Sequence, residues 1–235
     1  KAYKIPQNRT ASTMLTSPNM AERYVAWQQL HKVGAKAEGT LLNLWKSDDQ
    51  RIRARALHLL ARIKGAEKKY INIALADKNP DIRITGIRIA RERGLDVIPF
   101  VKKMANDKDA GVRRACAIAL RHNESPEAPA LWAKLAQQHD GKDRWYLEAL
   151  GIALDKQQDK FFGAWLEAVG SDWDTPSGRD IVWRSRSSKT SDLLVKILLN
   201  KKTKDEEKPR YIRALDFQSG PEKDAALIKL IGAGS

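Results

Sequence analysis

The sequence predicts an all-α fold, a right-handed α-α superhelix built from repeated helix pairs. Three apolar-Arg pairs follow one another at intervals of 30 residues: Ile52-Arg53, Ile82-Arg83 and Val112-Arg113. Each pair opens an apolar run with helical spacing, and the runs end at Gly65, Gly94 and Asn123. The sequence lacks the alternation of apolar and polar residues that is typical of half-buried strands. An internal repeat of this length is typical of helical solenoids, in which each unit buries its apolar face against its neighbours.

Composition excludes some classes of protein and leaves others open. The chain has 235 residues, 42% of them hydrophobic and 31% charged, which indicates neither disorder nor a membrane protein. Apolar runs all fall short of the roughly 20 residues that span a bilayer, and residues 1–12 contain no apolar core of a secretory signal. The first residue is Lys1 and the last residues are small, so we expect a mature or excised fragment. The net charge of +14 permits a polyanionic partner.

The first half of the chain is expected to form an arm and then a series of helices. Residues 1–16 lack a helical period and are predicted to be an extended arm, followed by a single repeat domain over residues 17–235. Ser17 is the expected N-cap of the first helix and Pro18 its first residue, with Gly34 as the stop. Tyr24, Trp27, Leu30 and Val33 are predicted to form its apolar face. Further helices are predicted over residues 41–45, 49–64, 66–76, 82–93, 97–105 and 112–120.

The second half is less regular, but helical spacing continues. Helices are predicted over residues 128–135, 143–154, 161–169, 181–186, 193–199, 211–217 and 225–231. A polar and aromatic segment, residues 170–176, interrupts the series. Residues 201–208 are predicted to be a charged, solvated loop.

The turns between the predicted pairs resemble those of a known repeat family. Asp77-Lys-Asn-Pro-Asp-Ile-Arg83 and Asp107-Lys-Asp-Ala-Gly-Val-Arg113 are similar to the inter-helix turn of HEAT repeats in their short bacterial form. Ser47 to Arg53 matches the same turn with Ser in place of Asp. The resemblance covers about residues 35–155, and it implies a ladder of hydrogen bonds between the turn Asp and the helix Arg of adjacent repeats. It therefore assigns a structural role to Asp77, Arg83, Asp107, Arg113 and Arg53.

A narrower resemblance lies further along the chain. The segments Asp143-Arg-Trp-Tyr-Leu-Glu-Ala-Leu-Gly-Ile-Ala153 and Trp173-Asp-Thr-Pro-Ser-Gly-Arg-Asp-Ile-Val-Trp-Arg-Ser-Arg186 look like the HEAT segment of large bacterial secreted proteins. Those proteins join a sugar-dehydrogenase-like β-propeller, HEAT repeats and a c-type cytochrome module. The resemblance implies that this chain is part of a longer periplasmic or extracellular protein; a chain complete as given would be cytoplasmic. Haem-attachment and propeller sequences are absent, so redox chemistry is not assigned to these residues.

The sequence offers little for catalysis or metal binding. Its four histidines, His31, His58, His122 and His139, lie on different predicted helices without the spacing of a metal site. Cys116 stands among small apolar residues and is expected to be buried. Phosphate-binding glycine loops are absent. We therefore predict no catalytic residue, no metal and no cofactor.

One predicted helix has a basic face that is suited to a polyanionic partner. Arg51, Arg55, His58 and Arg62 are expected to share the solvent face of the helix over residues 49–64, where they present positive charge to a phosphate backbone. Thirty residues further on, the equivalent positions are Asp81, Thr85, Arg88 and Glu92, and after another thirty Gly111, Ala115, Ile118 and His122. Because the basic stripe ends after one repeat, nucleic acid is an alternative partner that the sequence does not favour.

The enzymatic alternative is a HEAT-like DNA glycosylase acting on alkylated bases. Such enzymes combine a basic α-solenoid with Trp residues and a catalytic Asp, and the nearest candidates here are Trp173, Asp174, Asp180 and Trp183. Their spacing does not reproduce a motif of that family. Burial of the two indole rings in an irregular connection explains the Trp residues as well.

The function that we favour from the sequence is a non-catalytic scaffold, a spacer and docking surface whose partners are other protein domains. No membrane insertion is expected. The candidate contact residues each have a packing explanation as well: Arg51, Arg55, His58, Arg62, Trp145, Tyr146, Trp173, Arg179, Trp183 and Arg184.

Overall fold

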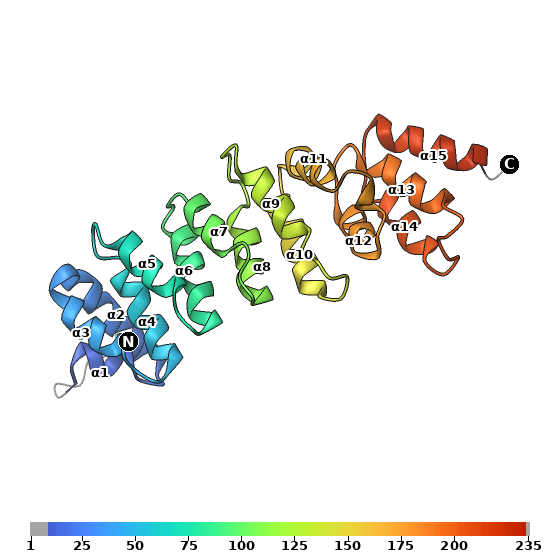
Figure 1. Ribbon diagram of the computed structural model, residues 1–235. Helices are drawn as coiled ribbons and strands as arrows, with labels where there is room; N and C mark the ends of the chain where they lie inside the picture. Colours follow the sequence, from blue (N-terminus) through green and yellow to red (C-terminus); the bar gives the residue numbers. More distant parts are fainter. Residues whose placement is uncertain (1–8, 234–235) are drawn as a thin grey trace. The chain divides into compact units, whose positions relative to one another are not determined.

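The computed structural model describes residues 9–233, and its regular elements are all helices (Figure 1). No strand occurs among these residues, as the sequence predicts. The chain divides into two compact units, one that ends at Phe100 and one that begins at Val101. The boundary falls within helix α7 (Ile98–Met104). The single domain expected over residues 17–235 stays a prediction.

The first unit contains the helices that precede this boundary. They are α1 (Ala11–Leu15), α2 (Met20–Val33), the 3-10 helix η1 (Gly34–Ala37), α3 (Glu38–Trp45), α4 (Gln50–Leu60), α5 (Glu67–Leu75) and α6 (Pro80–Glu92). Helix α3 packs against α4, and α5 packs against α6. Asn19, Asp49 and Asn79 cap α2, α4 and α6, because each side chain accepts a hydrogen bond from a backbone N–H of the first turn.

The second unit continues the same alternation. Its helices are α8 (Ala110–Ala119), α9 (Ala128–Ala136), α10 (Arg144–Ala153), α11 (Gln158–Val169), the 3-10 helix η2 (Gly170–Trp173), α12 (Pro176–Arg184), α13 (Thr190–Leu199), α14 (Lys208–Leu215) and α15 (Pro221–Ala233). Helix α8 packs against α10, α9 against α11, and α13 against α15. Asp109, Asp143 and Thr175 cap α8, α10 and α12.

One turn recurs before α2, α4, α6 and α8. Its first side chain accepts a hydrogen bond from the backbone N–H two residues later; the acceptors are Ser17, Ser47, Asp77 and Asp107. An Arg six residues after the acceptor donates back to the turn carbonyls before three of these helices. Arg23 donates to the carbonyl of Ser17 at 3.0 Å, and Arg83 and Arg113 donate to those of Asp77 and Asp107 at 2.9 and 2.7 Å. Each Arg thus fixes a turn to its own helix.

Arg53 makes the contact between repeats that the HEAT resemblance implies. Its guanidinium forms an ion pair with Asp77, which belongs to the next turn, and donates to the carbonyl oxygen of Trp45 at 3.2 Å. The guanidinium also lies 4.6 Å from the centre of the Trp45 ring. The side chains of Arg53 and Asp77 are only 16% and 10% exposed, so the pair connects two repeats below the surface.

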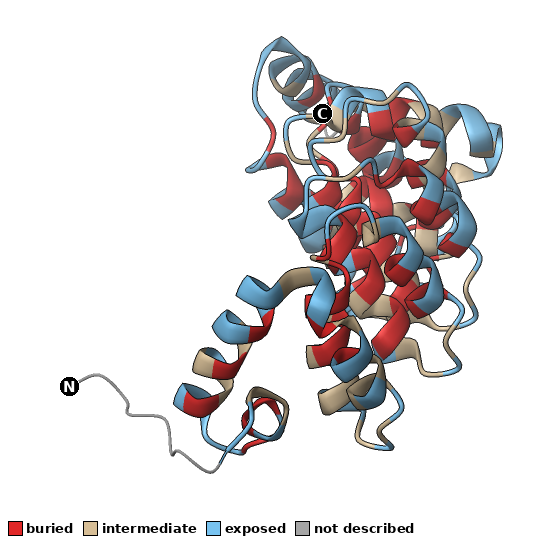
Figure 2. Cartoon of the chain, turned by 90° about the vertical axis from the view of Figure 1, so that its left-hand side faces the viewer, coloured by how far each residue is buried: buried red, intermediate tan, exposed pale blue. Residues whose placement is uncertain are grey.

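The buried side chains follow the predicted helical stripes. Tyr70, Ile71, Ala74 and Leu75 on α5 are all buried, as their spacing indicates. In the second unit the largest buried rings are Trp132, Trp165, Tyr146, Phe161 and Phe162. The indole N–H of Trp132 donates to the carbonyl of Leu150 at 3.1 Å. Figure 2 shows that buried positions lie on the sides of the helices that face other helices. Burial of each large apolar side chain contributes about 1.5–3 kcal/mol to the free energy of unfolding, so these contacts stabilise the packing of each helix on its neighbours.

The N-terminal region differs from the predicted extended arm. Residues 1–8 lie outside the described part of the chain, but Ala11–Leu15 form helix α1. The side chain of Thr10 accepts a hydrogen bond from the N–H of Thr13 at 3.3 Å, and Met14 and Leu15 are buried. Helix α1 packs against α2. Five residues are too few to show a period in the sequence, and tertiary burial stabilises this short helix.

Helix α2 also differs from its prediction at the start and on its apolar face. It begins at Met20 with Asn19 as the cap, because Ser17 is used in the recurring turn. Its buried residues are Glu22, Ala26 and Leu30, whereas Tyr24 and Val33 are 61% and 49% exposed. Arg9 donates to the carboxylate of Glu22 at 2.7 Å, which allows an acidic residue on the buried face. The aromatic residues of α2 therefore do not form its core face.

Helix α12 begins five residues earlier than predicted, at Pro176. Thr175 accepts a hydrogen bond from the N–H of Gly178 at 3.1 Å, and Pro176 occupies the first turn. A Cβ atom at Gly178 would lie 2.0 Å from the carbonyl oxygen of Trp173, so the approach of η2 to α12 requires glycine. The segment over residues 170–176 is a compact connection rather than a loop without structure.

Candidate functional site

A pocket in the first unit brings together apolar and cationic side chains from three helices. It has a volume of about 310 Å³ and lies where α1, α2 and α4 meet; we call it the Trp27 pocket. Its lining residues are Leu15, Met20, Arg23, Tyr24, Trp27, Arg55 and His58. Two of them, Arg55 and His58, are among the contact residues predicted from the sequence.

The apolar part of the Trp27 pocket comes from α2. Met20, Tyr24 and Trp27 follow at steps of four and three residues and therefore share one face of the helix. Met20 is 74% exposed and Tyr24 61% exposed, while Trp27 is half-buried. The ring of Trp27 stacks on His31 with centroids 4.9 Å apart. Tyr24 and Trp27 belong to the apolar face that the sequence predicts for α2; in the structure Tyr24 is exposed and Trp27 is half-buried.

Three arginines adjoin this apolar surface. Arg55 donates to the carbonyl of Leu15 at 3.0 Å, which attaches α4 to the end of α1. The guanidinium of Arg62 lies 5.3 Å from the centre of the Trp27 ring. Arg23 is held by the turn carbonyls of Ser17 and Pro18. Burial lowers the pKa of Arg55, and the positive charge of Arg23 lowers it further, so cations are crowded here.

His58 is the titratable residue of the Trp27 pocket in the physiological range. Burial lowers its pKa, the positive charge of Arg62 acts in the same direction, and the carboxylate of Glu92 opposes both. His58 is therefore predominantly neutral at pH 7. Its imidazole is available to gain a proton when a carboxylate binds nearby.

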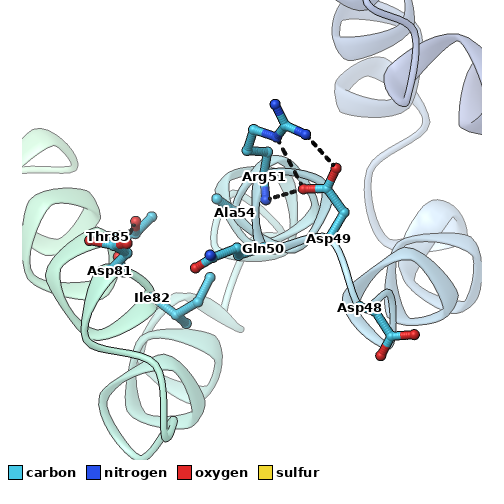
Figure 3. A pocket seen from close by; sticks show the side chains of 8 residues that line it. All are labelled: Asp48, Asp49, Gln50, Arg51, Ala54, Asp81, Ile82 and Thr85. Atoms are coloured by element: carbon cyan, nitrogen blue, oxygen red, sulfur yellow. Dashed lines mark hydrogen bonds and ion pairs between the residues drawn. The ribbon is translucent and has the colours of Figure 1, made fainter.

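Arg51 does not join Arg55, His58 and Arg62. Its guanidinium donates to both carboxylate oxygens of Asp49, at 3.2 and 3.1 Å (Figure 3). This pair lines a separate, open pocket of about 510 Å³ together with Asp48, Gln50, Ala54, Asp81, Ile82 and Thr85. The four residues predicted to share one basic face thus separate into a cationic group at the Trp27 pocket and an ion pair beside an acidic surface.

The structure places Trp145 and Tyr146 in different environments. Tyr146 is 2% exposed, donates its hydroxyl to the carbonyl of Leu135 at 2.9 Å and lies beneath the guanidinium of Arg113. It is therefore part of the core of the second unit and is not accessible to a partner. Trp145 is 72% exposed and remains a candidate contact residue.

The predicted contacts between Trp173 and Arg184 serve to join helices. Arg179 pairs with Asp174 and donates to the hydroxyl of Thr203 at 3.0 Å. Like Arg23, Arg53, Arg83 and Arg113, it follows its helix cap by four residues, so it occupies the position of a ladder arginine.

Arg184 and Trp183 are similarly engaged. Arg184 donates to the carboxylate of Glu148 at 3.0 Å, and a Cβ atom at Gly151 would lie 2.4 Å from its guanidinium carbon. The glycine thus lets Arg184 lie across α10. The guanidinium of Arg210 covers the ring of Trp183 at 4.6 Å. These contacts connect α12 with α10 and α14.

The residues considered for a glycosylase do not form one site. Asp174 and Asp180 line a pocket of about 580 Å³, but Trp173 and Trp183 are not among its lining residues. The hydrogen bond from Arg179 lowers the pKa of Asp174. Burial opposes ionisation of Asp180, but hydrogen bonds from His139 at 3.1 Å and Arg210 at 2.6 Å outweigh it and lower its pKa. Both carboxylates are therefore engaged as ionised partners of cationic or polar side chains.

The remaining ionisable groups show no arrangement for metal binding or nucleophilic chemistry within the described residues. No cluster of His, Cys, Asp and Glu within residues 9–233 has an arrangement suited to a metal ion. Cys116 is fully buried, and burial raises its pKa to about 12, so it is no nucleophile at neutral pH. None of the described helices has the length and apolar character needed to cross a bilayer.

Comparison with known proteins shows a similarity in the central part of the chain. A family model described as HEAT repeats matches residues 67–151, which extend from α5 into α10. The X-ray structure of YibA from Escherichia coli is similar over 94% of this chain and 90% of that chain, with 19% sequence identity and a TM-score of 0.49. No curated protein matches the sequence significantly. The chain is thus an all-α protein of packed helices, and its residues 67–151 are similar to HEAT repeats.

The structure also reveals scaffold residues that the sequence analysis missed. Ser17 accepts a hydrogen bond from the N–H of Asn19 as Ser47 accepts one from that of Asp49, 30 residues later. Arg23 likewise stands 30 residues before Arg53 and donates to the carbonyl of Ser17. The spacing of 30 residues between Ser17 and Ser47 is visible in the sequence. Ser17-Pro18 also matches the start of a helix, however, so the sequence alone does not assign Ser17 to the repeated turn. The repeated turn therefore begins with α2 and not with α4.

Proposed function

We propose that this chain is a non-catalytic scaffold that docks a segment of a partner protein, and that the Trp27 pocket receives a bulky apolar side chain of that segment. The observation that carries the proposal is the exposure of Met20 and Tyr24 beside Trp27 and the arginines. Clustered apolar side chains with a cationic rim are typical of protein interfaces, where Trp, Tyr and Arg contribute most of the binding energy.

The walls of the Trp27 pocket are held in place without a ligand. Arg55 is fixed to the carbonyl of Leu15, and Trp27 contacts both His31 and Arg62. A partner therefore does not have to order these side chains, and this lowers the entropic cost of binding. Such pre-organisation supports a docking role for the pocket.

The test is peptide selection on the whole protein. Random peptides displayed on phage are selected on the wild-type chain, and the enriched peptides are measured by fluorescence anisotropy on Tyr24→Ser and Met20→Ser. We expect enriched peptides to contain Leu, Phe or Trp and to lose about fivefold or more in affinity on either variant, since each removes an interface side chain worth more than about 1 kcal/mol. Ile228→Ser is the matched control, because Ile228 is 70% exposed and lies in the second unit.

The proposal is overturned if selection enriches no peptide over the Tyr24→Ser protein, or if affinity is unchanged on both pocket variants. Tyr24 and Met20 are mainly exposed, so their replacement is not expected to unfold the chain. Circular dichroism of each variant checks this directly.

We propose further that the partner is another domain of a longer extracytoplasmic protein, as the resemblance of residues 143–186 to the HEAT segment of secreted proteins suggests. Immunoblotting of fractionated source cells tests this. A band much larger than 26.5 kDa outside the cytoplasm is the expected result, and a cytoplasmic band near 26.5 kDa would contradict it.

A further inference from the structure

We infer that the segment docked in the Trp27 pocket is acidic, with Asp or Glu residues next to the apolar side chain that enters the pocket. This inference rests on the proposed function and specifies the chemistry of the partner. The lining of the Trp27 pocket includes Arg23, Arg55 and His58 but neither Asp nor Glu. Arg62 adds a fourth basic group next to Trp27.

Two of these arginines retain donors for a ligand. Arg55 uses one guanidinium nitrogen for the carbonyl of Leu15, and Arg62 contacts the face of Trp27. Within the described residues neither side chain forms an ion pair. A guanidinium has five N–H donors and binds a carboxylate through two parallel hydrogen bonds. Both side chains therefore have the capacity to hold acidic residues of a partner.

The charges around the pocket favour an anion as well. Burial lowers the pKa of Arg55 and the positive charge of Arg23 lowers it further, while the carboxylate of Asp49 acts in the opposite direction. Lys and Arg outnumber Asp and Glu by about two to one in the first 100 residues, whereas the rest of the chain is nearly balanced. A bound carboxylate relieves repulsion among the cations, and the surrounding positive field attracts an acidic segment before contact.

The neighbouring surface argues against nucleic acid as the occupant. The next pocket along α4 and α6 is lined by Asp48, Asp49 and Asp81, and Asp49 already neutralises Arg51. A phosphate backbone carries one charge per nucleotide, so a strand that continued from the Trp27 pocket in this direction would meet carboxylates. A short acidic peptide with one apolar anchor fits the cationic area without crossing that boundary.

The experiment compares labelled synthetic probes on the whole protein. Three fluorescein-labelled peptides carry a Leu-Phe pair flanked on each side by three Glu, three Gln or three Lys residues, and the fourth probe is a fluorescein-labelled oligothymidylate. Binding is measured by anisotropy at low and at physiological salt, for the wild type and for Arg62→Gln, Arg55→Gln and Arg55→Lys. Arg88→Gln is the matched control, because Arg88 is an exposed arginine of the same unit outside the pocket lining.

An exposed ion pair changes affinity by about fivefold or less, so two pairs make the Glu peptide about tenfold tighter than the Gln peptide. We expect this preference to fall with added salt and to shrink about threefold in Arg62→Gln and in Arg55→Gln. Arg55→Lys keeps the positive charge and should retain most of the preference for the Glu peptide. The control Arg88→Gln should retain most of this preference as well. The Lys peptide should bind most weakly.

The outcomes separate this inference from the proposed function. Equal affinity for the Glu and Gln peptides, with binding still sensitive to Tyr24→Ser, overturns the acidic partner and leaves apolar docking intact. Loss of the Glu preference in Arg88→Gln to the same extent as in Arg62→Gln overturns the assignment to this pocket. Oligothymidylate that binds more tightly than the Glu peptide and displaces it makes nucleic acid the occupant instead.

Discussion

Replacing Asp77 tests the contact that connects two repeats of the first unit. Asp77→Ala removes the acceptor for the N–H of Asn79, at 2.9 Å, and the ion pair with Arg53. A lost turn hydrogen bond costs about 1 kcal/mol, and a lost charged hydrogen bond about 1.5–3 kcal/mol. We therefore expect the free energy of unfolding to fall by about 3 kcal/mol. Asp77→Asn keeps the turn acceptor and should lose about half as much.

The assay is urea unfolding of the full chain, followed by circular dichroism, in a double-mutant cycle. Arg53→Met keeps an unbranched stem over the Trp45 ring, and the cycle with Asp77→Asn isolates the ionic contact. The expected coupling energy is about 1.5 kcal/mol. A coupling below about 0.5 kcal/mol, the usual limit of additivity, would refute the view that this pair holds adjacent repeats together.

Three further predictions follow from single sites. Gly178→Ala should lower the free energy of unfolding by about 3 kcal/mol or more, because the new Cβ would lie 2.0 Å from the carbonyl oxygen of Trp173. In Gly39→Ala on α3 the new Cβ meets no atom within 4 Å, so the free energy of unfolding should rise by about 0.5–1 kcal/mol. Urea unfolding measures both, and equal effects would contradict the argument. Cys116 should react with a thiol reagent at pH 8 only after unfolding, since burial raises its pKa to about 12; rapid labelling of the native protein would show that it is accessible. The pKa of His58 is lowered in the folded chain, so a proton binds His58 more tightly in the unfolded chain and the free energy of unfolding should fall as pH drops below about 6.5. His58→Gln should weaken this pH dependence. An identical pH profile in the variant would exclude His58 as its cause.

The regular part of the fold was predictable because its signals are local and repeated. Apolar spacing located α4, α5 and α8 to within a few residues. The turn residues Asp77 and Asp107 lie within residues 67–151, which a model of HEAT repeats matches. The N-terminal helix was harder to predict from the sequence. Helix α1 is short and depends on burial of Met14 and Leu15, which no local pattern reveals.

The candidate site was only partly predictable, for a physical reason. Spacing alone places four basic residues on one helix face: Arg51, Arg55, His58 and Arg62. It does not show that Asp49 forms an ion pair with Arg51 and neutralises it. Apolar spacing also cannot tell whether an aromatic face meets the core or solvent. Tyr24 belongs to such a face and is exposed, because the small Ala26 and the paired Glu22 pack inward in its place.

The most direct test of the docking site follows tryptophan indole N–H signals by nuclear magnetic resonance during titration with the Glu-flanked peptide. Trp27 lines the pocket, whereas Trp145 is 72% exposed in the other unit and serves as an internal control. The account predicts a saturable shift of the Trp27 signal and an unchanged Trp145 signal. A shift of Trp145 with no change at Trp27 would contradict it.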